Sequence, residues 1–245
     1  MVGVEVCINC DSNQSVTASV SAARLGGAST IELCSAMKFD GLTPLARHID
    51  EARQAFKDHN GLMVMIRPRK GDFYFSDHEI QLMREQIKIA ANWGADGVVF
   101  GVLQKNDNAI AVDKVNSLVE LCHKYNLRST FHRAFDATPN FLESVRNLID
   151  AGVDRVLTSG TKWYDRRPAI DGLNNLRSII KCAENRIETV IGGGISPQNV
   201  DKILGELPVQ NSRISVHAYS GVQQDGVVTK SAVHNLVETV QYCQS

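Results

Sequence analysis

Carboxylate and thiol side chains recur together at the ends of two short, β-branched segments near the start of this chain of 245 residues. Glu5 and Cys7 lie two residues apart in the first segment, and Glu32 and Cys34 have the same spacing in the second. Residues two apart in a strand share a face, so each carboxylate points the same way as its thiol. Neighbouring strands lie about 4.8 Å apart, close enough for the two pairs to interact. The spacing therefore predicts a cluster of two carboxylates and two thiols.

Buried carboxylates need compensating charge, and two arginines follow the third segment of this kind. Arg67 and Arg69 lie one segment further along the chain, and an arginine can pair with a carboxylate through two hydrogen bonds. We therefore expect them to neutralise Glu5 and Glu32. The alternative is a purely structural Glu–Arg network that fills the core.

Two histidines, His132 and His217, also end strand-like segments. Each could be an acid/base group, a metal ligand or a hydrogen-bonded core residue. Together with Glu5 and Glu32 they form a set of two histidines and two carboxylates, which suits a divalent-metal isomerase or an acid/base pair. In an enzyme, His132 would move protons with Glu32 or Asp136. The expected catalytic residues are Glu32, Arg67, His132, Asp136 and His217.

Three consecutive glycines, Gly192, Gly193 and Gly194, precede a helix start at Ser196-Pro197. The free backbone N–H groups and the dipole at a helix start favour a bound anion. The alternative is that these glycines only allow a tight turn. The expected anion-binding residues are Arg69, Ser159, Gly192, Gly193, Gly194 and Ser220.

The chain has six cysteines, and two of them are candidate metal ligands. Two thiolates side by side, as expected for Cys7 and Cys34, select soft ions, with Cu(I) foremost. Cys7-Ile-Asn-Cys10 is a single C-x-x-C motif without a second pair, so we interpret Cys10 as coincidental. Cys122, Cys182 and Cys243 lie on or beside apolar helix stripes and are expected in the core.

The elements that must position these groups alternate along the whole chain. Short β-branched runs alternate with segments of helical period, which indicates βα units around a parallel sheet. Ser76 with Glu79 fits a capping box at the start of one helix. The expected strands span residues 4–7, 30–34, 63–67, 97–102, 129–132, 155–158, 189–192 and 214–217.

Eight such units in about 250 residues match a single (β/α)8 TIM barrel covering residues 1–245. The polar residues then gather at the C-terminal ends of the strands, where barrel enzymes carry their active sites. A doubly wound sheet is the alternative, but the expected G-x-G-x-x-G loop is missing after the first strand.

Composition and charge exclude several classes of partner. The chain is 43% hydrophobic and 22% charged, with a formal net charge of -1, so it lacks the basic character of a nucleic-acid binder. No apolar run reaches the roughly 18 residues of a membrane span, and the first residues do not read as a secretory signal. We expect a cytoplasmic protein with reduced thiols, no nucleic-acid or membrane partner, and a copper ion or a small anion as its ligand.

Six motifs together resemble the CutC copper-homeostasis family. They are Ile31-Glu-Leu-Cys34, Gly41-Leu-Thr-Pro44, Ile66-Arg-Pro-Arg69 with Gly71-Asp-Phe73, Phe131-His-Arg-Ala-Phe-Asp136, Arg155-Val-Leu-Thr-Ser-Gly160 and Val216-His217. The resemblance implies a cytoplasmic TIM-barrel protein, a homodimer, that binds Cu(I) through Cys34 and Cys7. The chain departs from the family pattern in its eighth loop, where His217-Ala-Tyr-Ser220 replaces a His-x-Ser-Ser-like run.

Two hypotheses follow from these observations. The resemblance favours a cytoplasmic copper-homeostasis protein with Cys7 and Cys34 as Cu(I) ligands. The polar residues taken alone favour a TIM-barrel lyase or isomerase that acts on a small anionic or phosphorylated substrate.

Overall fold

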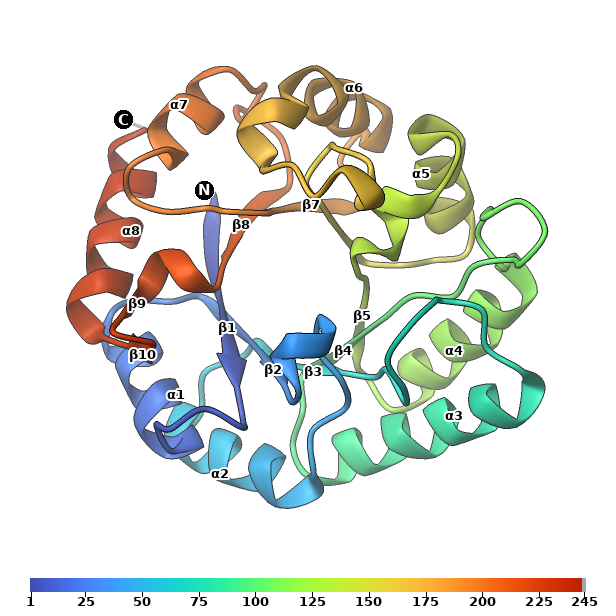
Figure 1. The fold of residues 1–245 in the computed structure, drawn as a ribbon, viewed down its shortest axis with the longest axis horizontal. Helices are drawn as coiled ribbons and strands as arrows, with labels where there is room; N and C mark the ends of the chain where they lie inside the picture. The colour runs from blue at the N-terminus through green and yellow to red at the C-terminus, as the bar shows by residue number, and fades with distance from the viewer. Residues whose placement is uncertain (244–245) are drawn as a thin grey trace.

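Eight parallel strands form a closed barrel surrounded by helices in the computed structural model, which describes residues 1–243 (Figure 1). Each strand pairs with the next, and β1 pairs with β8 to close the ring. The (β/α)8 barrel expected from the sequence is therefore confirmed. The strands are β1 (Gly3–Asn9), β2 (Thr30–Cys34), β3 (Leu62–Met65), β4 (Gly97–Phe100), β5 (Arg128–Phe131), β6 (Arg155–Thr158), β7 (Glu188–Gly192) and β8 (Ile214–Ala218).

A helix follows each strand, and its apolar side packs on the outside of the barrel. The helices are α1 (Val16–Leu25), α2 (Ala46–Phe56), α3 (Asp77–Asn92), α4 (Val112–Lys124), α5 (Phe141–Asp150), α6 (Leu173–Ala183), α7 (Val200–Gly205) and α8 (Lys230–Tyr242). The capping box of Ser76 and Glu79 is present at the start of α3. Within residues 1–243, no helix combines the length and apolar character that crossing a bilayer requires.

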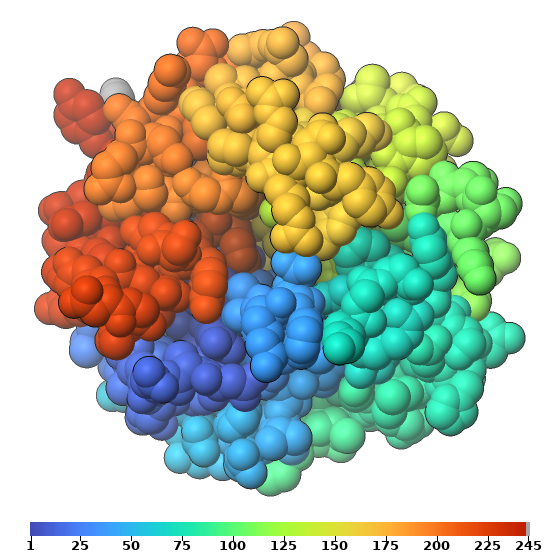
Figure 2. Space-filling view, in the orientation of Figure 1, coloured from blue at the N-terminus to red at the C-terminus, as the bar shows by residue number. Residues whose placement is uncertain are grey.

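Short 3-10 helices lie in the loops that follow the C-terminal ends of the strands. Figure 2 shows that the segments after β2 and β6, coloured light blue and gold, meet over the middle of this face. These short elements are η1 (Met37–Phe39), η2 (Arg133–Ala137), η3 (Trp163–Asp165), η4 (Ala169–Gly172) and η5 (Ser220–Val222), followed by a small hairpin of β9 (Gln223–Gln224) and β10 (Val227–Val228). They narrow the mouth of the barrel.

Three strands end earlier than the sequence pattern indicates. Strands β3, β4 and β5 stop one or two residues before the predicted ends at positions 67, 102 and 132. Local side-chain hydrogen bonds follow the ends of β3 and β5. The backbone N–H of Arg67 donates to Thr43 Oγ1, and the ring of His132 accepts from the N–H of Ala134. Arg67 and His132 therefore lie in the loops at the barrel mouth.

The interior of the barrel contains a buried ion-pair network centred on Arg155. Arg155 is fully buried, and its Nη1 donates to Glu5 Oε2 at 2.7 Å. Its Nε lies 3.4 Å from Glu188 Oε1, so the guanidinium bridges carboxylates from β1 and β7. The expected pairing of Glu5 with Arg67 or Arg69 is wrong, because Arg155 reaches it directly from across the barrel.

Replacing Arg155 by methionine removes the positive charge between two buried carboxylates, so Arg155→Met is expected to lower the free energy of unfolding by about 3–5 kcal/mol. Arg128→Met is the matched control, because Arg128 pairs with the same Glu188 from a partly exposed position and surface pairs contribute at most about 1 kcal/mol. Urea unfolding of both variants measures the difference. Equal losses would show that the buried network has no special role.

Candidate functional site

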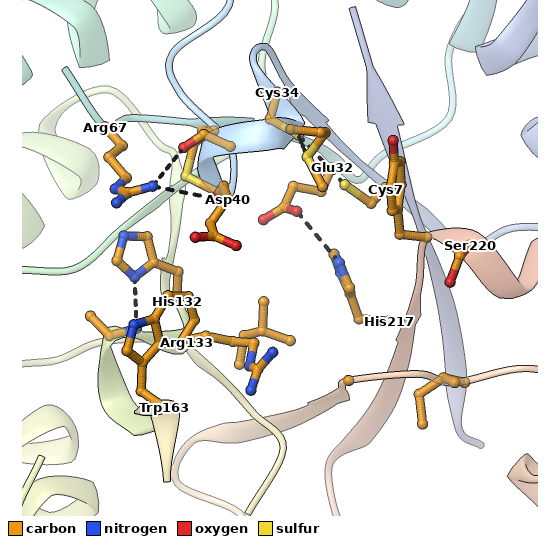
Figure 3. A pocket seen from close by; sticks show the side chains of 18 of the residues that line it. Cys7, Glu32, Cys34, Asp40, Arg67, His132, Arg133, Trp163, His217 and Ser220 are labelled. Atoms are coloured by element: carbon orange, nitrogen blue, oxygen red, sulfur yellow. Dashed lines mark hydrogen bonds and ion pairs between the residues drawn. The ribbon is translucent and has the colours of Figure 1, made fainter. Parts of the chain in front are cut away.

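A cavity of about 250 Å³ opens at the C-terminal ends of the strands, where barrel enzymes carry their sites (Figure 3). Strand-end residues form its inner wall, and residues from the loops after β2, β3, β5, β6, β7 and β8 complete it. The lining includes nine predicted site residues, namely Cys7, Glu32, Cys34, Arg67, His132, Gly193, Gly194, His217 and Ser220. The structure thus brings most of the predicted residues to one place.

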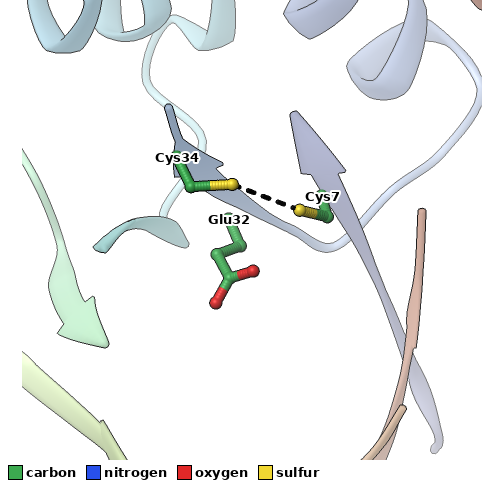
Figure 4. Close-up of side chains that lie close together, drawn as sticks. All are labelled: Cys7, Glu32 and Cys34. Carbon is green, nitrogen blue, oxygen red and sulfur yellow. Dashed lines mark hydrogen bonds between the residues drawn. The ribbon is translucent and has the colours of Figure 1, made fainter. Parts of the chain in front are cut away.

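Sulfur atoms gather at one side of this cavity. The two thiol sulfurs of Cys7 and Cys34 lie 3.5 Å apart, and both residues are buried (Figure 4). The Sδ atom of Met37 lies 3.1 Å from the Sγ atom of Cys34. The hydrogen bond to Cys34 and burial raise the pKa of Cys7 well above its ordinary value. The thiol of Cys7 is therefore protonated at neutral pH when no metal is bound.

Local backbone geometry places Met37 over Cys34. Ala36 adopts a left-handed conformation with φ of 52°, and its N–H donates to the Asp11 carboxylate at 2.5 Å. This turn starts η1, whose first residue is Met37. Sequence reasoning missed Met37, although a methionine three residues after a candidate ligand cysteine is a usable signal.

His217 lies between two carboxylates. Its Nδ1 is 3.0 Å from Glu5 Oε1, and its Nε2 is 3.6 Å from Glu32 Oε2. Burial alone would lower the pKa of His217, but the charge of Glu32 and the hydrogen bond to Glu5 outweigh burial and raise it. Burial would likewise raise the pKa of Glu5, but Arg155 and His217 lower it far below its ordinary value. The arrangement favours a protonated His217 next to an ionised Glu5.

Glu32 connects the histidine with the thiols. Its carboxylate lies within 4.8 Å of the sulfur atoms of Cys7 and Cys34. Burial raises the pKa of Glu32 more than the charge of His217 lowers it. Its Oε1 atom is buried and has no hydrogen-bond partner within residues 1–243. Glu32 can therefore exchange a proton or accept a hydrogen bond from a bound group.

His132 stands apart from the carboxylates with which the sequence analysis grouped it. Its Nδ1 accepts from the N–H of Ala134 at 3.1 Å, so in the neutral ring the proton is on Nε2. Burial and the nearby charge of Arg67 lower the pKa of His132 to about 3. The buried Nε2 has no partner among residues 1–243. His132 is thus a neutral hydrogen-bond donor in the wall of the cavity.

The two arginines after β3 have different surroundings. Arg67 donates to the backbone carbonyls of Phe39 at 2.6 Å and Gly71 at 2.7 Å, so it ties two mouth loops together. Arg69 turns toward α3, where its Nε lies 2.5 Å from Glu79. Arg67 therefore shapes the cavity, whereas the charge of Arg69 is already paired.

Asp136 and Ser159 form a network behind the cavity wall. The fully buried Asp136 accepts from Arg133 Nε at 2.8 Å, from Thr158 Oγ1 at 2.5 Å and from Ser159 Oγ at 2.9 Å. Burial raises the pKa of Asp136. These bonds hold the guanidinium of Arg133 against Trp163, 5.3 Å from the ring centroid, at the edge of the cavity. Asp136 and Ser159 thus position Arg133.

The glycine loop contributes backbone to the cavity. Gly193 and Gly194 have φ values of 109° and 73°, which other residues adopt only with strain. A side chain at Gly192 would start 2.8 Å from Leu157 Cδ1. The helix after the loop, α7, has six residues, and the N–H of Ser196 is satisfied by Asn199 Oδ1 at 3.0 Å. Backbone conformation and close packing thus account for glycine at these positions without a bound anion.

The remaining cysteines lie outside the sulfur cluster. Cys122 is buried in the core, and Cys10, Cys182 and Cys243 are partly buried beside it. No two of the six cysteines form a disulfide.

Comparisons with known proteins agree on one family. The profile of the CutC family matches residues 2–218. The copper homeostasis protein cutC homolog of Mus musculus is 40% identical over 201 residues, covering 82% of this chain and 68% of the mouse protein. The corresponding protein of Homo sapiens is 39% identical over the same lengths.

Solved structures give the same result for the fold. The crystal structure of the putative copper homeostasis protein CutC from Streptococcus agalactiae superposes with a TM-score of 0.76 at 29% identity, covering 89% of this chain and 98% of that one. A 3-keto-L-gulonate-6-phosphate decarboxylase from Vibrio cholerae has a TM-score of 0.66 at 13% identity, which shows a shared barrel alone.

The raised pKa of His217 predicts a pH-dependent contribution to stability. A histidine whose pKa is higher in the folded than in the unfolded state stabilises the folded protein fully below the unfolded-state pKa of about 6.5. This stabilisation is lost as the pH rises through the folded-state pKa. His217→Gln should therefore cost about 1–3 kcal/mol near pH 6 and less near pH 9. Denaturant unfolding at both pH values measures this, with the exposed His123→Gln as control. A loss that is the same at both pH values would contradict the assignment.

Proposed function

This chain belongs to the CutC family, and we propose that it is a copper-homeostasis protein that binds one Cu(I) ion through Cys7, Cys34 and Met37. The observation that carries the proposal is the sulfur cluster, in which Cys34 lies 3.5 Å from Cys7 and 3.1 Å from Met37. All three residues line the same cavity, through which an ion can reach them.

The donor set favours a soft ion. Thiolate and thioether sulfurs select Cu(I), whereas carboxylates and imidazoles suit harder ions. Glu32 is close enough to be a further ligand, and a Cys–Cys–Glu set would suit Zn²⁺ better. The thioether of Met37 next to Cys34 supports copper instead.

Copper binding must displace at least one proton. Thiols bind metals as thiolates, and the pKa of Cys7 lies well above its ordinary value because of its hydrogen bond to Cys34 and its burial. Glu32 beside the thiols can accept the displaced proton. The affinity for Cu(I) is therefore expected to rise with pH across the neutral range.

Location and assembly complete the proposal. A cytoplasmic protein with one domain over residues 1–245 fits the six unpaired cysteines, because reducing compartments keep such thiols free.

A homodimer is supported by Leu82, Ile89 and Trp93, which are exposed apolar side chains on and just after α3. Sedimentation velocity distinguishes the dimer from a monomer.

The sulfur ligands can be tested one at a time by anaerobic Cu(I) titration against bicinchoninate. Cys7→Ser and Cys34→Ser should each weaken binding by about 100-fold or more, because loss of a ligand costs more than loss of a group that supports one. Met37→Leu keeps the size of the side chain but removes the sulfur, and should weaken binding about tenfold.

The control is Cys10→Ser, which changes a nearby thiol that lies outside the sulfur cluster. Its affinity should equal that of the wild type. The assignment fails if Cys10→Ser loses copper, or if Cys34→Ser retains it.

A further inference from the structure

Three buried polar atoms in the cavity wall have no hydrogen-bond partner among residues 1–243. They are Glu32 Oε1, Arg67 Nε and His132 Nε2, and their residues are 3%, 2% and 5% exposed. All three residues line the cavity beside the sulfur cluster. Folded proteins leave few buried polar groups unpaired, because each one costs free energy. Their concentration around one cavity points to a ligand that supplies the missing partners.

The cavity is larger than a copper site requires. A volume of about 250 Å³ lies just below the 300 Å³ at which pockets for drug-sized molecules begin. Cys7 and Cys34 lie at one side of the cavity, and His132 lies at another side, as Figure 3 shows. Room therefore remains for a small organic molecule between Glu32 and His132.

The unpaired atoms specify the chemistry of that molecule. The unpaired oxygen of Glu32 can accept a hydrogen bond, whereas the Nε2–H of neutral His132 only donates. A hydroxyl group is the neutral group that can satisfy either of them. The rings of Trp163 and Tyr219, which also line the cavity, offer apolar surface for the carbon skeleton.

The charges around the cavity favour a neutral ligand over a phosphorylated one. The two Nη groups of Arg67 donate to backbone carbonyls, and the guanidinium of Arg133 is paired with Asp136. Two carboxylates, Glu32 and Asp40, face the same space and would repel a dianion. The glycine loop could support an anion only through the start of α7, and this helix has just six residues.

We propose that the barrel mouth binds a small, neutral, polyhydroxylated molecule of monosaccharide size, whose hydroxyl groups donate to Glu32 and accept from His132. The contacts differ from the proposed copper ligands, because neither Glu32 Oε1 nor His132 Nε2 belongs to the sulfur cluster, although Glu32 lies beside it. Arg67, Asp136 and His217 act as positioning residues, since each holds a loop or a side chain that forms the wall.

The test uses copper-free protein and NMR spectroscopy of the histidine side chains. The probes are D-ribose, D-glucose and myo-inositol as neutral polyols, with D-ribose 5-phosphate and inorganic phosphate as anions, all at millimolar concentrations. The ring signal of His132, assigned from its loss in His132→Asn, should shift saturably with at least one neutral polyol. A histidine on the surface, His123, should not respond.

Variants then test the two contacts. Glu32→Gln and His132→Asn should each raise the dissociation constant of the responding polyol about tenfold or more, because glutamine replaces one acceptor oxygen by a donor NH₂ group and the shorter asparagine withdraws the donor from the ligand. The asparagine oxygen of His132→Asn can still accept from Ala134, so the local turn keeps its bond. Glu120→Gln, on an exposed part of α4, is the matched control and should leave the constant unchanged.

Each other outcome overturns the proposal. If none of the three neutral polyols shifts the His132 signal of the wild type, the ligand class is wrong. If only ribose 5-phosphate or phosphate does so, the cavity is an anion site. If both variants bind as the wild type does, the assigned contacts are wrong. Because copper is absent throughout, failure here leaves the sulfur site untouched.

Discussion

The ion pair between Arg155 and Glu5 is the interaction on which the arrangement of the barrel mouth depends. Arg155 crosses the barrel from β6 and holds Glu5 on β1 at 2.7 Å. Glu5 in turn orients His217 at 3.0 Å, and His217 lies 3.6 Å from Glu32, which stands beside the thiols. Charges alternate along this series, so each buried group offsets the cost of burying its neighbour. Removing one member would leave the others uncompensated.

This network separates two chemistries inside one cavity. On one side, the sulfur atoms of Cys7, Cys34 and Met37 gather in apolar surroundings that also include Met63 and Met65. On the other side, His132 and Arg67 present hydrogen-bond donors. Glu32 lies between the two sides, so a proton released from a thiol and a hydroxyl group of a bound molecule would meet the same carboxylate. Binding at one side is therefore expected to influence the other.

The sequence was sufficient to predict the barrel, because hydrophobic periodicity is a local property repeated in every βα unit. It also predicted that Glu5, Cys7, Glu32 and Cys34 share the interior, since alternation along a strand decides which way each side chain points. It could not identify the partner of Glu5, because Arg155 is 150 residues away and the pairing depends on closure of the barrel. Met37 was missed for a different reason. Its position depends on a left-handed turn at Ala36, a residue type that gives no turn signal.

The most direct test of the account is X-ray absorption spectroscopy at the copper K-edge of the protein loaded anaerobically with one equivalent of Cu(I). The sulfur cluster predicts that the atoms bound to copper are sulfurs alone, three in the wild type and two in Met37→Leu. A shell containing nitrogen or oxygen would place the ion at His217 or Glu32. That result would contradict the assignment of Cys7, Cys34 and Met37 as the copper site.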